Sequence, residues 1–137
     1  MEYTIHSLDE LNILAKQLII QIKQERIILF EGEMGAGKTS LIKAICKEIG
    51  YTEDVTSPTY SIVNEYANNK ILIYHFDLFR LKNLEEVLDI GFEEYLDSTG
   101  ICLVEWPDKA IDLIDHGMKI QIKKIDVNSR KISTFNF

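Results

Sequence analysis

The chain has 137 residues and a formal net charge of −7, from 22 acidic and 15 basic side chains. Its length suits one domain, and its 46% hydrophobic and 27% charged content exclude a disordered protein. Because proteins bind nucleic acid mainly through lysine and arginine, we expect no binding of DNA and no direct hold on RNA. No apolar run reaches membrane-spanning length and the N-terminus does not resemble a secretion signal, so we expect a cytoplasmic location and no membrane contact.

The first third of the chain alternates between helical and strand patterns. Ser7 and Glu10 are spaced as a capping box ahead of apolar residues at helical spacing, which indicates a helix start. Gly50 follows the second helical pattern, where helices commonly end. The expected elements are a helix over residues 8–23, a buried strand over 26–32 and a second helix over 38–49.

The rest of the chain is richer in strand patterns. Asn83 with Glu86 indicates a further helix start, and Pro107 suits the first position of another helix. The expected strands are 60–66 and 71–76, joined by the turn ANNK, then 101–105, and a hairpin over 119–137 that turns at 127–129. This order predicts an α/β fold: one domain over residues 1–137, built as a three-layer sandwich around a mixed, mostly parallel central sheet.

The stretch GEMGAGKT, residues 32–39, fits the phosphate-binding pattern G-x-x-x-x-G-K-[ST] without a gap. Glycines let the backbone amides of such a loop point at phosphate oxygens, and the following helix presents its positive end. Lys38 is expected to reach the β- and γ-phosphates, and the Thr39 hydroxyl to bind Mg²⁺. The motif therefore predicts a P-loop NTPase-like fold that binds a nucleotide. The expected contacts are Gly32, Glu33, Met34, Gly35, Ala36, Gly37, Lys38, Thr39 and Ser40.

Two carboxylates end apolar strands, where a P-loop enzyme needs a group for its metal. Asp77 ends ILIYHFD and Glu105 ends ICLVE. A carboxylate there can serve Mg²⁺ or orient the attacking water. We therefore expect Lys38, Asp77 and Glu105 to be catalytic, and Thr39, Asp77 and Glu105 to serve the metal. The alternatives are a turn cap for Asp77 and a solvated strand end for Glu105.

Three further features each have two interpretations. Trp106, the only tryptophan, is by itself typical of packing in a core. His75 lies within a strand pattern and is expected to be a strand residue rather than a base. The run TSPT, residues 56–59, is either an ordinary turn or a segment that responds to the bound nucleotide.

Together these motifs resemble the TsaE (YjeE) family of ATPases, which serve in bacterial tRNA threonylcarbamoyladenosine synthesis. The pieces SPTY, HFDLFRL and EW are far more specific than the P-loop. The likeness extends over most of the chain, through GEMGAGKTS, SPTYSIVNEY, IYHFDLFRL and GFEEYLDSTGICLVEWPDKA.

The resemblance implies an ATP/ADP site that uses Mg²⁺. The segment Thr56–Tyr60, with Thr59 in contact with the nucleotide, would sense the γ-phosphate. Trp106 would lie beside the nucleotide, and the helix start around Ser7 and the turn at Ser129 would lie near the adenine. TsaB-like and TsaD-like proteins would be the partners, with tRNA reached only through them. Hydrolysis would reset that complex between turnovers.

The alternatives are a small-molecule kinase and a nucleotide-dependent interaction module without significant turnover. A kinase needs a lid or arginines around the transferred group, whereas this chain has three scattered arginines and no lid insertion. A GTPase is not expected, because Asn69-Lys70 is not followed by the x-Asp that completes the base-reading element.

Overall fold

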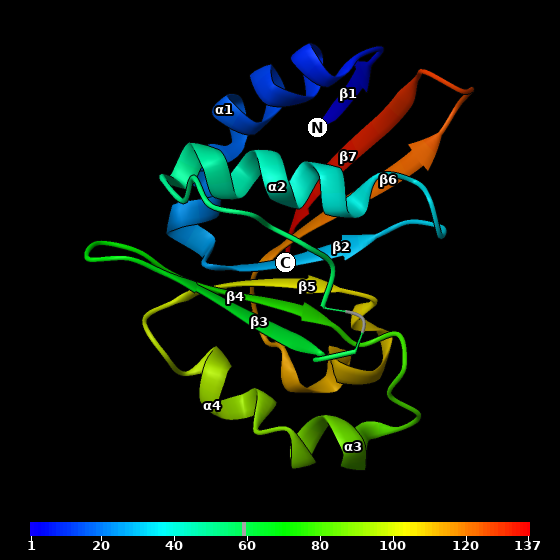
Figure 1. Cartoon of the computed structure of the whole chain (residues 1–137). Coiled ribbons are helices and arrows are strands. Elements are labelled where there is room, and N and C mark those ends of the chain that lie inside the picture. The colour runs from blue at the N-terminus through cyan, green and yellow to red at the C-terminus, as the bar shows by residue number, and fades with distance from the viewer. Residues whose placement is uncertain (59) are drawn as a thin grey trace.

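A seven-stranded sheet runs through the described part of the molecule, with helices on both of its faces (Figure 1). The computed structural model describes residues 1–58 and 60–137. In spatial order the strands are β1 (Glu2–Ile5), β7 (Arg130–Asn136), β6 (Met118–Lys124), β2 (Ile27–Glu31), β5 (Ile101–Glu105), β4 (Leu72–Asp77) and β3 (Val63–Ala67). The central strands β6, β2, β5 and β4 pair in parallel and the outer pairings are antiparallel. The predicted P-loop NTPase-like sandwich with a mixed sheet is thus confirmed, and the parallel strands form its centre.

Two helices cover one face of the sheet (Figure 1). Helix α1 (Leu8–Glu25) begins after Ser7, whose Oγ accepts a hydrogen bond from the Glu10 amide at 3.2 Å, as the capping pattern predicts. Helix α2 (Lys38–Ile49) ends at Gly50 in the left-handed conformation, φ 119°, again as predicted. Both helices bury an apolar face against the sheet, in one core cluster with residues of β2, β5 and β6.

The opposite face is covered by α3 (Leu84–Asp89), α4 (Phe92–Leu96) and the 3₁₀ helix η1 (Pro107–Leu113). Asn83 caps α3 through a 3.0 Å bond from the Glu86 amide to its side chain, as the spacing predicts. The rings of Phe76 and Phe92 meet edge to face, 4.9 Å between centroids, in the core beneath. Among the helices described, none combines the length and apolar character that crossing a membrane requires.

The strand expected over residues 60–66 begins only at Val63, so that prediction was wrong for residues 60–62. The Ile62 backbone is left-handed, φ 70°, a conformation that β-branched residues rarely adopt. Its amide donates to the Pro58 carbonyl at 2.7 Å, and its carbonyl accepts from the Asp77 amide at 2.8 Å. These contacts override the local strand preference and connect the turn to the end of β4.

Candidate functional site

The predicted phosphate-binding loop connects β2 to α2 at the carboxyl edge of the parallel strands (Figure 1). Gly37 precedes α2 with φ 105°, in the region that favours glycine. Gly32 leaves no room for a side chain, because a Cβ there would lie 2.7 Å from the Ile122 carbonyl oxygen of β6. Arg130 of β7 donates from Nε to the Ala36 carbonyl at 2.9 Å. Strands β6 and β7 therefore support one side of the loop, and α2 begins on the other.

Lys38 is the first residue of α2 and is 6% exposed. Its ammonium donates to the carbonyls of Gly32 and Glu33, the latter at 3.2 Å. The same nitrogen lies 3.8 Å from the centroid of the Trp106 ring, a cation–π contact. Burial lowers the pKa of Lys38, and the nearby carboxylates of Glu105 and Asp77 oppose that shift. The Lys38 ammonium thus lies over the loop, and among the described residues its contacts are with two carbonyls and an indole ring that a phosphate could replace.

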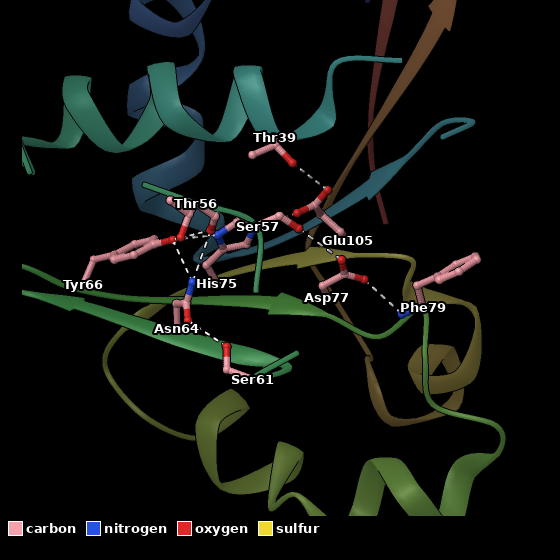
Figure 2. Close-up of polar contacts among 10 residues, drawn as sticks. All are labelled: Thr39, Thr56, Ser57, Ser61, Asn64, Tyr66, His75, Asp77, Phe79 and Glu105. Carbon is pink, nitrogen blue, oxygen red and sulfur yellow. Dashed lines mark hydrogen bonds and ion pairs between the residues drawn. The ribbon is translucent and has the colours of Figure 1, made fainter. Parts of the chain in front are cut away.

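The two predicted carboxylates lie opposite each other on neighbouring strands, because Asp77 of β4 pairs with Glu105 of β5. Both are buried. The Thr39 hydroxyl donates to Glu105 Oε1 at 3.4 Å (Figure 2). The Asp77 oxygens accept from the Ser57 hydroxyl at 3.3 Å and from the Phe79 amide at 3.0 Å. Since β5 and not β4 is the neighbour of β2, Glu105 is the acid on the strand beside the loop.

These groups border one cavity of about 600 Å³. It is lined by Glu33, Met34, Gly35, Ala36, Gly37, Lys38, Thr39, Ser40, Ser57, Tyr60, Asp77, Phe79, Arg80, Glu105 and Trp106. Of the predicted contacts, Gly32 instead lines an adjoining hollow against β6, and Thr59 lies outside the described residues. Tyr60 belongs to the segment that was expected to sense the γ-phosphate, whereas Phe79 and Arg80, which lie in HFDLFRL, were not predicted as site residues. Such a volume is in the range of small-molecule sites.

Trp106 lines this cavity and is not a core residue. Its backbone is left-handed, φ 55° and ψ 60°, which is uncommon for a residue with a side chain. The indole contacts both the Lys38 ammonium and the Phe79 ring, whose centroid is 4.9 Å away. This conformation turns the ring at the end of β5 toward the loop.

We expect the fluorescence of Trp106 to change when a nucleotide with phosphates is bound. Phosphates would draw the Lys38 ammonium away from the indole face, and as the only tryptophan its signal needs no label. Titration with ADP and with ATP measures the effect, and adenosine, which has no phosphates, is the control. An unchanged spectrum at an ADP concentration that calorimetry shows to be saturating would contradict it.

A smaller cavity of about 220 Å³ adjoins the loop beside the start of α1. Its lining includes Ser7 and Leu8, together with Gly37 and Ser40, which also line the larger cavity. Ser129 does not line it, but its hydroxyl lies 2.9 Å from Nδ1 of His6, which does. The position of an adenine here stays a prediction.

The sequence pattern predicts His75 only as a strand residue, yet the structure places its ring against a site carboxylate. His75 Nε2 lies 2.7 Å from Glu105 Oε2, and the ring is fully buried. One signal was available: His75 and Asp77 are two positions apart, so a strand turns both toward the same face. The strand that lies beside β4, and therefore the contact of His75 with Glu105, could not be predicted without the strand order.

The oxygen donors at this point suit a hard cation. Thr39, Asp77 and Glu105 offer one hydroxyl and two carboxylates around one cavity. In the part of the chain that the structure describes, no group of three or more His, Cys, Asp or Glu side chains could hold a metal ion. Mg²⁺ is usually bound by one or two carboxylates together with substrate phosphates. The donor set therefore fits Mg²⁺ that arrives with a nucleotide.

Comparison with known proteins identifies the family of this chain. The family model "Threonylcarbamoyl adenosine biosynthesis protein TsaE" matches residues 5–132. The tRNA threonylcarbamoyladenosine biosynthesis protein TsaE of Rickettsia conorii is 35% identical over 133 residues, 96% of this chain and 75% of that protein. Its namesake in Haemophilus influenzae is 39% identical over 95 residues, 68% of this chain and 60% of that protein. The crystal structure of YdiB from Bacillus subtilis matches with a TM-score of 0.77 at 26% identity, covering 99% of this chain and 84% of that one. This chain belongs to the TsaE family of threonylcarbamoyl adenosine biosynthesis proteins.

Proposed function

We propose that this chain is a Mg²⁺-dependent ATPase subunit of threonylcarbamoyladenosine synthesis. It would hydrolyse ATP to support a TsaB-like and a TsaD-like protein that modify the adenosine beside a tRNA anticodon. The observation that carries the proposal is the convergence of Lys38, Thr39 and Glu105 on one cavity at the P-loop. Family membership supports the pathway, since the relatives carry this biosynthesis in their names.

Each group has a defined task in this proposal. The Lys38 ammonium and the first amides of α2 bind the phosphates, while the carbonyl and indole contacts of Lys38 are given up. Thr39, Asp77 and Glu105 would hold Mg²⁺, which when bound neutralises phosphate charge. Glu105 also orients the attacking water and accepts its proton as the bond from the γ-phosphorus to the bridging oxygen breaks, giving ADP and phosphate.

The surface charge agrees with a subunit that works through protein partners. With 22 acidic against 15 basic residues, the chain is poorly suited to bind tRNA phosphates itself. We therefore assign tRNA contact to the partner proteins, in the cytoplasm where tRNA is modified. Partner binding would also complete the hydrolytic site and so raise turnover.

Phosphate release from ATP tests this function directly. We expect slow Mg²⁺-dependent release by the chain alone, an increase when a TsaB–TsaD pair is added, and loss of both rates in EDTA. An unrelated acidic protein in place of the pair is the control. Transfer of phosphate to a small acceptor would make the chain a kinase. Nucleotide binding without release, even with the pair present, would make it an interaction module.

A further inference from the structure

A line of hydrogen bonds leads from Glu105 to the backbone of residue 56 (Figure 2). His75 Nε2 lies 2.7 Å from Glu105 Oε2, and His75 Nδ1 lies 3.0 Å from the Tyr66 hydroxyl. That hydroxyl is also 3.0 Å from the Thr56 carbonyl oxygen. The line therefore crosses strands β5, β4 and β3 and ends in the segment before the Ile62 turn.

The three side chains of this line are almost out of contact with solvent. His75 is 0%, Glu105 3% and Tyr66 5% exposed. A buried polar atom without a partner costs free energy, so each proton must lie between a donor and an acceptor. No fully buried side-chain nitrogen or oxygen among residues 1–58 and 60–137 lacks a partner.

The chemistry of the end groups sets the direction of the bonds. An ionised carboxylate only accepts, so His75 Nε2 must carry a proton and donate it to Glu105. The Tyr66 hydroxyl has one proton, which it can donate to the Thr56 carbonyl or to Nδ1 of His75, both 3.0 Å away. The Thr56 carbonyl keeps a donor, because Asn64 Nδ2 lies 3.2 Å away. Whichever of the two accepts the Tyr66 proton, His75 Nε2 is the donor to Glu105.

The hydrogen bond from His75 to Oε2 of Glu105 determines the direction in which Oε1, the other carboxylate oxygen, points. His75 occupies Oε2, which leaves Oε1 facing the Thr39 hydroxyl at 3.4 Å. We propose that His75 and Tyr66 are positioning residues that fix this orientation of the Glu105 carboxylate. The proposal rests on the proposed ATP hydrolysis, in which Oε1 must meet the water or the metal.

The same line connects both site carboxylates to one short piece of backbone. Thr56 is joined to Glu105 through Tyr66 and His75, and the next residue, Ser57, donates to Asp77 Oδ2 at 3.3 Å. A displacement of residues 56 and 57 would therefore reach both acids. This gives the segment that was predicted to respond to the nucleotide a physical route to the hydrolytic groups.

Two substitutions of His75 separate positioning from packing. His75→Gln keeps an N–H donor at about the reach of Nε2, whereas His75→Asn places its amide near the position of Nδ1 and leaves Glu105 without that donor. We expect kcat to fall roughly 10- to 100-fold in the Asn variant, the usual effect of losing such a partner, and far less in the Gln variant. KM should change no more than about threefold in either. Equal kcat values in the two variants would overturn the proposal.

A second comparison removes single hydroxyls. Tyr66→Phe should lower kcat roughly two- to tenfold, the worth of one hydrogen bond. Tyr51→Phe is the matched control, because that ring stacks on Tyr66 at 5.0 Å but its hydroxyl meets only the exposed Glu53 carboxylate in the contacts described. An equal loss in both variants would overturn the role of the line.

The proton positions can be read without any nucleotide. Long-range ¹H–¹⁵N spectra of the wild-type imidazole should show a proton on Nε2 of His75, and a bare Nε2 would overturn the proposal whatever the kinetics show. Wild-type phosphate release is measured first. If the wild type itself releases none, the proposed function fails, and the spectra alone decide whether His75 donates to Glu105.

Discussion

Replacing Glu105 with glutamine is expected to lower kcat for ATP hydrolysis roughly 10²- to 10⁴-fold, the contribution typical of a positioned general base. The amide keeps the size of the side chain and can still bond to His75 and Thr39. It neither accepts the proton of the attacking water nor carries the charge that attracts Mg²⁺. The affinity for ADP should change little, because the P-loop contacts with the phosphates are intact.

The measurement pairs single-turnover phosphate release with calorimetric titration of ADP. Glu31→Gln is the matched control: this acid also ends a strand, β2, but it pairs with Lys119 at 3.1 Å instead of lining the larger cavity. The control should hydrolyse ATP as the wild type does. Wild-type turnover in Glu105→Gln would show that Glu105 takes no part in the reaction.

Replacing Lys38 with alanine is expected to weaken ATP binding roughly 10- to 100-fold, as for the loss of a charge-assisted hydrogen bond. The ammonium is already at the loop, in contact with the Gly32 and Glu33 carbonyls and the Trp106 ring. The loss of affinity should be larger for ATP than for adenosine, because adenosine has no phosphate to contact the Lys38 ammonium.

Calorimetry with ATP, ADP and adenosine measures this difference, and thermal unfolding shows whether the variant keeps its fold. Lys47→Ala serves as the control, because it removes the same charge from an exposed position in the last turn of the same helix. Unchanged ATP affinity in Lys38→Ala would contradict the assignment of the loop.

Elements whose limits are encoded locally were predicted well. Ser7 and Gly50 mark the ends of helices through contacts within their own turns, so their effect is visible in a short stretch of sequence. Strand β1 and helix α4 were not predicted, because elements of four and five residues are too short to show a period. The turn at Ile62 was missed for another reason, since its bond to Asp77 spans fifteen positions of the chain.

The same distinction between local and long-range signals applies to the residues of the candidate site. Residues of the loop and the two strand-end acids could be named from the sequence, because a motif and a strand end each imply where a side chain lies. Contacts that depend on strand order could not. Glu105 meets His75 only because β5 lies beside β4, and Trp106 meets Lys38 only because its backbone takes a left-handed conformation.

The support that β6 and β7 give to the phosphate loop has a consequence for the order in which the molecule can be assembled. The loop motif is complete at residue 39, whereas the partners of Gly32 and Ala36 on those strands, Ile122 and Arg130, come more than eighty residues later. During synthesis the ribosome releases the motif long before the strands against which it lies. Contacts so distant along the chain require closing a long loop, which slows their formation. A nascent chain thus carries every residue of the loop but lacks the two strands that support its shape.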